Sequence, residues 1–204
     1  MTDQLNLWKS EFGNEYISRN PINKDVILRL TRDWGRMLSK AISPSPASTL
    51  EVGSNIGRNL AVLNNFISEL HGIEPNAEAC KAARQNPNLA NVDIIEGDGF
   101  NLPFPDESID LVFTSGVLIH VSPDDLDKMI DEIYRVSKRY ILVIEYFSHT
   151  PVSIPYRGLD GYLFKRDYGA YYLDRFPSLR PLDYGFLWQR FDSSDNSNWW
   201  LFEK

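Results

Sequence analysis

The sequence predicts one α/β domain, in which helices cover both faces of a mostly parallel sheet. The first observation is a βαβ pattern: the apolar run 49–52, a glycine turn, a segment whose apolar residues recur every three or four positions, and a second apolar run at 70–73. Such units build parallel sheets with right-handed crossovers. The second is that further apolar runs follow, separated by amphipathic segments. The third is the length of 204 residues, which suits a single domain, 1–204, with a substantial core.

Two helical segments are expected ahead of the first strand. Residues 5–20 carry apolar and aromatic side chains interrupted by Gly13, which indicates a short helical arm, assigned to residues 1–24. Its polar residues Tyr16, Arg19 and Asn20 can close over a ligand as a lid and contact the substrate. The alternative is that the arm only contributes core side chains. A second helix is predicted from Asp25 to Ile42, with these residues facing inward: Ile27, Leu28, Leu30, Trp34, Met37, Leu38 and Ile42.

The rest of the sheet is assigned by the same reasoning. In the helix after the glycine turn, the expected inner stripe runs through Phe66 and Ile67, and Asn76 can cap a short helix over 77–85. Strands are predicted at 92–96, 109–115 and 140–146, with a helix that starts at Ser122-Pro123. Two final strands, 184–191 and 199–203, predict an antiparallel hairpin that completes seven strands. The stretch 147–183 is too long for a tight connection, so it is expected to recognise the substrate.

The glycine turn carries the first indication of chemistry. It reads Glu51-Val-Gly53-Ser54-Asn55-Ile-Gly57, and it allows a ligand to approach the backbone while the helix start offers N–H groups to an anion. Glu74 ends the second strand, where a carboxylate can accept hydrogen bonds from both hydroxyls of a ribose. Glu51, two residues before the first glycine, suits a cationic ligand better than a pyrophosphate. We therefore expect a nucleoside derivative, unless the turn is only a connection.

This segment resembles motif I of the class I S-adenosylmethionine-dependent methyltransferases. Asn55 departs from the commoner glycine, but asparagine tolerates left-handed backbone. The resemblance implies a Rossmann-like, seven-stranded fold and S-adenosylmethionine as the cofactor. It also implies that Asp98 accepts from the adenine amino group beside Phe100, although an ordinary aspartate turn is the alternative. The implied cofactor contacts are Glu51, Gly53, Ser54, Asn55, Gly57, Glu74, Pro75, Asn76, Asp98, Gly99, Phe100, Ser115 and Gly116.

A narrower resemblance rests on segments near both ends of the chain. EFGNEYISRN, the SNIG form of motif I, FKRDYG and DYGFLW with WWLFEK together resemble the pseudaminic acid biosynthesis-associated methylases. That resemblance implies methyl transfer to nitrogen or oxygen of a nonulosonic sugar acid, its precursor or a glycan. Two alternatives stay open: a methyltransferase of another small amine or acid, and a module that binds S-adenosylmethionine without catalysis.

Candidate catalytic and substrate-binding residues follow the predicted strands. His120, just past the fourth strand, is the first candidate for a general base because its ordinary pKa lies near neutrality, and Tyr146 is the second. His120 can instead cap a helix or contact the cofactor only. Arg157, Lys165 and Arg166 can clamp a carboxylate or phosphate, although they can also form solvated ion pairs.

Composition restricts the partners. The net charge of −7 disfavours a nucleic-acid partner, and no apolar run is long enough for a membrane span. The lone Cys80 fits a reducing cytoplasm, where the protein is expected to reside. The three histidines are far apart in the sequence, which predicts no metal site. The oligomeric state is left open. A Y-x-x-x-K pair, Tyr134 and Lys138, matches a motif of short-chain reductases, although the glycine turn lacks that family's form.

Overall fold

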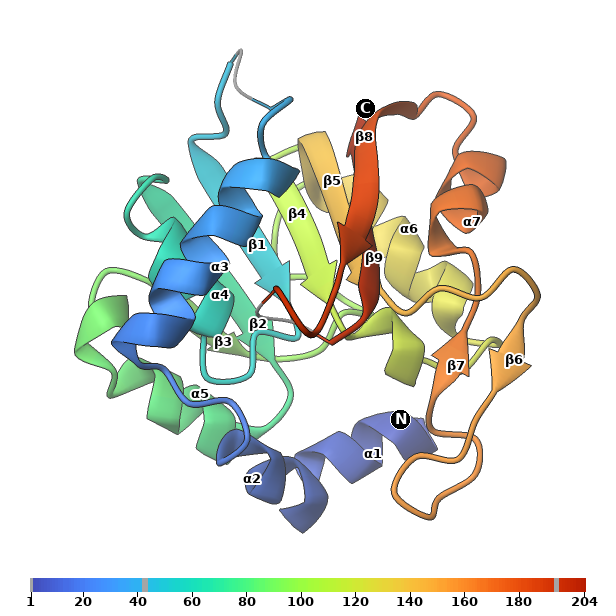
Figure 1. Cartoon of the computed structure of the whole chain (residues 1–204), viewed down its shortest axis with the longest axis horizontal. Helices are drawn as coiled ribbons and strands as arrows, with labels where there is room; N and C mark the ends of the chain where they lie inside the picture. The colour runs from blue at the N-terminus through green and yellow to red at the C-terminus, as the bar shows by residue number, and fades with distance from the viewer. Residues whose placement is uncertain (1, 42–43, 193–194) are drawn as a thin grey trace.

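The computed structural model describes residues 2–41, 44–192 and 195–204 (Figure 1). Its main feature is a seven-stranded sheet in the order β3-β2-β1-β4-β5-β9-β8. The first five strands are parallel, whereas β9 runs antiparallel to both of its neighbours. This is the Rossmann-like methyltransferase fold, so the predicted fold class is confirmed. The strands are β1 (Ser48–Val52), β2 (Glu69–Glu74), β3 (Asp93–Glu96), β4 (Ile109–Ser115), β5 (Ser137–Glu145), β8 (Arg180–Leu187) and β9 (Ser197–Glu203).

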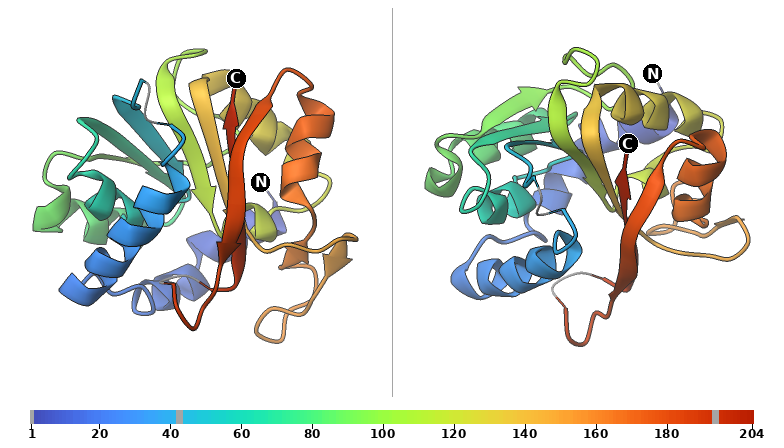
Figure 2. Two further views of the ribbon diagram at one scale, coloured as in Figure 1. Left: turned by 45° about the horizontal axis from the view of Figure 1, so that its top comes forward. Right: turned by 90° about the horizontal axis from the view of Figure 1, so that it is seen from above.

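Two apolar cores lie on the two faces of this sheet, between the strands and the helices that lie on either side of them in Figure 2. Alternation along the strands separates them: Leu111 and Phe113 of β4 belong to one core and Val112 to the other. The first core is covered by α3 (Lys24–Met37), α4 (Arg58–Leu63) and α5 (Ala77–Arg84), and the second by α6 (Leu126–Val136) and α7 (Tyr168–Arg175). Short 3₁₀ turns, η1 (Pro87–Leu89) and η2 (Leu118–His120), complete these layers.

The remaining elements lie near the carboxyl ends of the parallel strands. The arm forms two helices, α1 (Asp3–Lys9) and α2 (Glu11–Ile17), which run across that edge of the sheet (Figure 1). A two-stranded sheet of β6 (Val152–Ser153) and β7 (Phe164–Lys165) stands beside them. Order along the sheet reverses between β1 and β4, and open α/β sheets bind ligands at such a switch point. The arm therefore covers the edge where a ligand is expected.

Several boundaries differ from the predictions. The helix after the glycine turn ends at Leu63, so Phe66 lies beyond it and is 64% exposed, and Leu28 is 69% exposed on the outer face of α3. Ile42, the predicted end of α3, lies outside the described residues. The strand β8 begins four residues before the predicted 184, because aromatic content there does not mark which residues pair with β9. None of the described helices combines the length and the apolar character that a membrane crossing requires.

Candidate functional site

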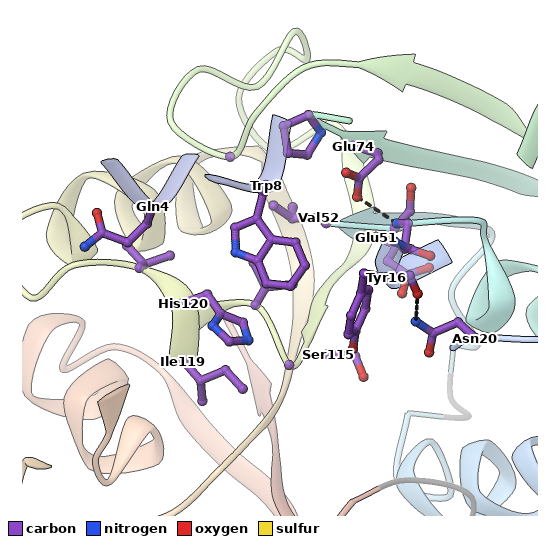
Figure 3. Close-up of a pocket in the computed structure, with 18 of the residues that line it drawn as sticks. Gln4, Trp8, Tyr16, Asn20, Glu51, Val52, Glu74, Ser115, Ile119 and His120 are labelled. Atoms are coloured by element: carbon purple, nitrogen blue, oxygen red, sulfur yellow. Dashed lines mark hydrogen bonds between the residues drawn. The ribbon is translucent and has the colours of Figure 1, made fainter. Parts of the chain in front are cut away.

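A cavity of about 630 Å³ opens at the carboxyl ends of β1, β2 and β4, under the arm (Figure 3). Residues from the arm, the glycine turn, the loop after β4, the stretch 147–183 and the connection between β8 and β9 line it. The fold thus brings most of the candidate site residues together around one cavity. The predicted residues that line it are Tyr16, Arg19, Asn20, Glu51, Gly53, Ser54, Asn55, Glu74, Pro75, Asp98, Gly99, Phe100, Ser115, Gly116, His120, Tyr146 and Arg157.

The glycine turn depends on left-handed backbone at three positions. Gly53, Asn55 and Gly57 have φ values of 77°, 48° and 76°, so the prediction that Asn55 tolerates this conformation is confirmed. A Cβ on Gly53 would lie 2.5 Å from Cγ2 of Val117, so the turn also needs glycine for close packing against the loop after β4. Sequence and packing therefore fix the backbone that forms the floor of the cavity.

Three amides of this turn are paired within the protein. The N–H groups of Gly53 and Ser54 both donate to the carbonyl oxygen of Ile73, at 2.8 and 3.0 Å, and that of Gly57 donates to the carbonyl of Ser54 at 2.8 Å. Anion binding by the N–H groups at the start of α4, which begins at Arg58, stays a prediction. The bonds to Ile73 join β1 to β2, which brings Glu51 and Glu74 to neighbouring strand ends.

Glu74 is held by two backbone amides. Its Oε2 accepts from the N–H of Asn55 at 2.8 Å (Figure 3), and its Oε1 accepts from the N–H of Asn76 at 2.8 Å. Burial raises the pKa of Glu74 to about 7, and the two N–H donors oppose that shift. Each carboxylate oxygen keeps a further lone pair for a ligand hydroxyl. Glu74 can therefore accept further hydrogen bonds from a ligand.

Glu51 is buried and only half satisfied. Its Oε1 accepts from Nδ2 of Asn59 at 2.7 Å, whereas its Oε2 has no hydrogen-bond partner among the described residues. Burial raises the pKa of Glu51 to about 8, although the nearby Arg58 opposes that shift. In the adjoining turn, Ser54 Oγ and Asn55 Oδ1 also lack partners within the described chain. Buried polar atoms are nearly always paired, and these three oxygens remain available to hydrogen bonds from a ligand.

The loop after β3 places a third acid, Asp98, at the cavity. Oδ1 of Asp98 accepts from the N–H of Phe100 at 3.0 Å, which is an aspartate turn, and the residue also lines the cavity. Gly99 is buried, and a Cβ there would lie 2.8 Å from Val52 and 2.9 Å from Met129. The carboxylate of Asp98 and the ring of Phe100 therefore share the cavity wall, an acid beside an apolar surface.

His120 is fixed as a hydrogen-bond acceptor. Its Nδ1 lies 2.7 Å from the carbonyl oxygen of Tyr162, so this nitrogen carries the proton and Nε2 carries the lone pair. The ring packs against Trp8 of the arm and Tyr156, at centroid distances of 4.9 and 4.8 Å (Figure 3). Burial lowers the pKa of His120 to about 4. The imidazole is thus neutral near pH 7 and weakly basic.

Tyr146 does not fit the role of a general base. Its hydroxyl donates to Oδ2 of Asp195 at 2.6 Å, and burial together with this carboxylate raises the pKa of the phenol. A phenol that keeps its proton cannot remove one from a substrate. The structure therefore does not favour Tyr146 as a base, and its role stays a prediction, although its side chain lines the cavity.

The arm is fastened to the loop that carries Glu74. Nδ2 of Asn76 donates to the carbonyl of Trp8 at 3.0 Å and to Oδ1 of Asn14 at 2.9 Å, while its Oδ1 caps α5 as predicted. A Cβ on Gly13 would lie 1.9 Å from the Trp8 carbonyl oxygen and 2.7 Å from Nδ2 of Asn76. Gly13 therefore permits the close approach of arm and loop.

Four predicted residues do not line the cavity. Gly57 is buried against Leu89 at the start of α4, and the side chain of Asn76 is directed at the arm. Lys165 places its ammonium 5.2 Å from the ring centre of Tyr146, and the guanidinium of Arg166 lies 4.9 Å from that of Tyr171. These two cations pack on tyrosine rings and do not line the cavity, so their contact with a substrate stays a prediction.

Sequence reasoning missed several lining residues. Trp8 of the arm, Tyr156, Gln189, Asp192 and Asp195 all contribute to the cavity. The connection between β8 and β9, which carries the last three, folds back onto α3 because Asp192 accepts from Arg32 and Arg36 at 3.0 and 2.9 Å. No local pattern marks such a contact between segments so distant in the sequence. The acidic residues of this connection, Asp192 and Asp195, were the sequence feature that pointed to a role at the site.

Glu145 was also missed, although it ends the fifth strand. It is fully buried, and its carboxylate accepts from the N–H groups of Val117, Leu118 and Ile119 at 3.1, 3.1 and 3.3 Å. Glu145 thereby fixes the turn that presents His120. An acid inside the apolar run YILVIEY was a signal that this position carries more than packing.

The Y-x-x-x-K pair lies away from the cavity. The Tyr134 hydroxyl bonds to Ser178 Oγ at 3.0 Å, and Lys138 pairs with Asp110 at 3.5 Å. Neither residue lines the cavity, so the reductase alternative has no support in the structure. Among the described residues, no group of three or more His, Cys, Asp or Glu is arranged to hold a metal ion.

Comparison with known proteins gives a family match for the central part of the chain. Residues 50–142 match the family described as "Methyltransferase domain". The chain is 29% identical over 126 residues to an uncharacterized methyltransferase, YcgJ, of Bacillus subtilis. The aligned residues make up 59% of this chain and 49% of that protein. It is 28% identical over 138 residues to a demethylmenaquinone methyltransferase of Geobacillus, and these residues make up 66% of this chain and 49% of that protein. The chain spans about half the length of the curated relatives it matches.

Solved structures extend the similarity in fold to the whole chain. Magnesium protoporphyrin IX methyltransferase of Synechocystis with bound S-adenosylmethionine matches with a TM-score of 0.72 at 13% identity, covering 100% of this chain and 98% of that one. The 1,6-didemethyltoxoflavin-N1-methyltransferase of Burkholderia thailandensis, solved with its substrate and S-adenosylhomocysteine, matches with a TM-score of 0.70 at 14% identity, covering 98% and 88%. The fold therefore recurs in proteins that bind this cofactor.

Proposed function

We propose that this chain, whose residues 50–142 match a methyltransferase domain, is an enzyme that transfers a methyl group from S-adenosylmethionine to a small molecule. The observation that carries the proposal is the pair of buried acids at neighbouring strand ends. Glu51 has an oxygen without a partner in the described chain, and Glu74 is held by two amides beside it. A ligand with both an amino group and a ribose diol satisfies this pair.

The residues of the cavity fit S-adenosylmethionine by chemistry. Glu74 would accept from the ribose hydroxyls, Glu51 would accept from the amino group, and Asp98 would accept from the adenine amino group beside Phe100. Arg58, which lines the cavity and has no ion pair within the described residues, can approach the carboxylate. When bound, the cofactor supplies an electrophilic methyl group on a cationic sulfur.

The protein's own contribution is positioning and exclusion of water. The leaving sulfide is neutral, so the transfer needs little acid assistance, and the rate depends on holding the acceptor atom in line with the methyl carbon. Trp8 and Tyr16 line the cavity on the side of the arm, while Ser115 and Gly116 line it at the end of β4. The arm thus acts as a lid whose closing would remove water from the reacting pair.

A nonulosonic sugar acid, its precursor or a glycan is the acceptor class that we favour. The support is the resemblance of the chain's end segments to the pseudaminic acid-associated methylases and two cations in the cavity. Arg157 lines it and lies 5.7 Å over the ring of Tyr156, and Arg19 has a buried Nη1 without a partner in the described structure. Arginine binds carboxylates in bidentate geometry. The alternative is another small amine or acid, since a structural neighbour is named for methylating toxoflavin precursors.

The same reasoning extends to the setting of the enzyme. The lone, buried Cys80 and the acidic net charge favour a reducing cytoplasm and disfavour a nucleic-acid partner. The lid, the cavity and the stretch 147–183 all belong to one domain in this proposal.

An assay with isotopically labelled methyl donor tests the proposal. The chain is incubated with labelled S-adenosylmethionine and a panel of sugar acids, amines and other small acids, and products are separated by mass. We expect label in at least one sugar acid. Label in other acceptors alone would contradict the sugar-acid assignment. Tight cofactor binding without transfer to any acceptor would contradict the enzyme proposal and favour a binding module.

A further inference from the structure

Two side chains in the cavity are locked as hydrogen-bond acceptors. Nδ1 of His120 donates a hydrogen bond to the carbonyl oxygen of Tyr162 at 2.7 Å, so Nε2, on a side chain that lines the cavity, carries the lone pair and has no hydrogen-bond partner among the described residues. The Tyr146 hydroxyl has one proton, and it is committed to Asp195 at 2.6 Å. Its oxygen therefore offers only lone pairs to a ligand.

The Asp195 carboxylate, which accepts the hydrogen bond from Tyr146, is itself held in place. Asp195 uses its other oxygen, Oδ1, to accept from Nε2 of Gln189 at 3.2 Å, so both ends of its carboxylate are occupied. These two contacts hold Asp195 as the acceptor and Tyr146 as its donor.

The number of protons on the methylated group distinguishes a hydroxyl oxygen from an amine nitrogen. A hydroxyl group carries one proton, so it can donate to His120 or to Tyr146 but not to both. A neutral primary amine carries two protons and can donate to both while its lone pair points elsewhere. Attack by an alcohol also requires a base strong enough to take its proton, whereas a neutral amine already presents a nucleophilic lone pair. His120, with its lowered pKa, and the protonated Tyr146 are both poor bases for an alcohol.

We infer that the methyl acceptor is the nitrogen of a primary amine, oriented by His120 Nε2 and the Tyr146 hydroxyl oxygen, and that Asp195 is a positioning residue for Tyr146. This inference rests on the proposed methyl transfer and names its substrate class. The nitrogen lone pair forms the new bond to carbon as the carbon–sulfur bond breaks and its electron pair stays on sulfur. The product is a secondary ammonium ion, which then loses one proton to solvent.

The identity of the methylated atom is the direct test. The chain is incubated with S-adenosylmethionine carrying an NMR-visible methyl carbon, first with matched sugar acids that bear an amine, an N-acetyl group or a hydroxyl at one carbon, then with small-molecule extract of the source cells. The carbon shift of the transferred methyl distinguishes N-methyl from O-methyl products. We expect N-methyl products, none from the hydroxyl or N-acetyl compounds, and loss of the extract product after its amines are acylated beforehand.

An O-methyl or C-methyl product would overturn the inference while leaving the proposed function intact. Absence of any methylated product from either source would overturn the proposed function, and the inference with it. The two failures are therefore distinguishable.

Variants test the role of Asp195. Tyr146→Phe removes one acceptor and should lower kcat about tenfold, the effect of one lost hydrogen bond, while the Kd for S-adenosylhomocysteine stays unchanged. Asp195→Leu should match it, whereas Asp195→Asn, which keeps an oxygen facing Tyr146, should retain most of the turnover. Tyr184→Phe is the matched control, because Tyr184 is 75% exposed on β8 and does not line the cavity. Equal losses for Asp195→Asn and Asp195→Leu, or a loss of cofactor affinity, would overturn the positioning role.

Discussion

At the residue scale, the Glu74 carboxylate combines two tasks. It holds the glycine turn through Asn55 and the start of α5 through Asn76, and it faces the cavity. An acid buried in this way is costly unless both oxygens are satisfied. The backbone satisfies one lone pair of each oxygen, and a ribose would supply the donors for the others.

Replacement of Glu74 by alanine should therefore remove cofactor binding. Two hydrogen bonds to a charged acceptor contribute about 1.5–3 kcal/mol each, so the loss corresponds to at least a ~100-fold weaker Kd. Titration calorimetry with S-adenosylhomocysteine measures it. Glu96→Ala is the matched control: Glu96 pairs with Glu74 across β2 and β3 but is exposed and does not line the cavity. Normal binding by Glu74→Ala would refute the ribose assignment.

Residue identities near the glycine turn could be predicted because strand, turn and strand lie close in sequence. Glu51, Glu74 and the left-handed Asn55 are all read from spacing and backbone preference. Asp195 and Trp8 could not be predicted, since their contacts join segments distant in sequence: Asp195 bonds to Tyr146, 49 residues away, and Trp8 to Asn76, 68 residues away. The roles of His120 and Tyr146 depended on hydrogen bonds to Tyr162 and Asp195, which no spacing encodes.

At the scale of elements, the arm is attached by few contacts. The helix α1 has no buried residues and α2 buries only Gly13. The described polar contacts to the rest of the chain include those of Asn76 and the bond from Gln4 Nε2 to the carbonyl of Gly161 at 3.0 Å. Elements with so little burial open at low free energy, which suits a lid.

Gly13→Ala should release the arm. The added Cβ would collide with the Trp8 carbonyl, so α2 could no longer dock against Asn76. We expect faster proteolytic cleavage within residues 2–20 and weaker cofactor binding, with little change in the global free energy of unfolding. Gly35→Ala is the matched control, because Gly35 also lies in a helix but its Cβ meets nothing within 4 Å, and it should stabilise the protein by about 0.5–1 kcal/mol. Unchanged protection of the arm in Gly13→Ala would contradict the lid.

Element types were predictable from periodicity, and their ends were less so. The strand over 109–115 and the helix over 77–84 were found because apolar pattern and a capping residue agree there. β8 starts earlier than predicted because pairing with β9 extends it through Arg180 and Pro181, which have no strand propensity. The short strands β6 and β7 pair two residues each and leave no periodic trace.

At the scale of the whole molecule, three buried acids couple stability to pH. Burial raises the pKa of Glu51 to about 8 and those of Glu74 and Glu145 to about 7, from ordinary values of 4.5. Between those values the folded protein holds more protons than the unfolded chain, so the free energy of unfolding falls as pH rises. His120, whose pKa is lowered, acts in the opposite sense, but only below its ordinary 6.5.

Urea unfolding of the ligand-free protein should therefore show stability decreasing between about pH 6.5 and about pH 8, where His120 does not contribute. The Glu145→Gln variant isolates one acid: its deficit relative to the wild type should shrink by about 0.7 kcal/mol between pH 6.5 and pH 8, the upper part of a pKa shift that is worth about 3 kcal/mol in full. A constant difference across this range would mean that Glu145 is already charged when folded.

The arrangement of the whole chain places all of these features at one edge. The switch point between β1 and β4 aligns the glycine turn with the loop that carries His120, and the arm and the connection between β8 and β9 close the remaining sides. The central claim is that this cavity holds a sulfonium nucleoside between Glu51 and Glu74.

A crystal structure with S-adenosylhomocysteine tests that claim most directly. We expect electron density in the cavity under the arm, with the ribose hydroxyls at the Glu74 carboxylate and the amino group at Glu51 Oε2. Density for the compound at any other place, or its absence from a crystal that is saturated with it, would contradict the account.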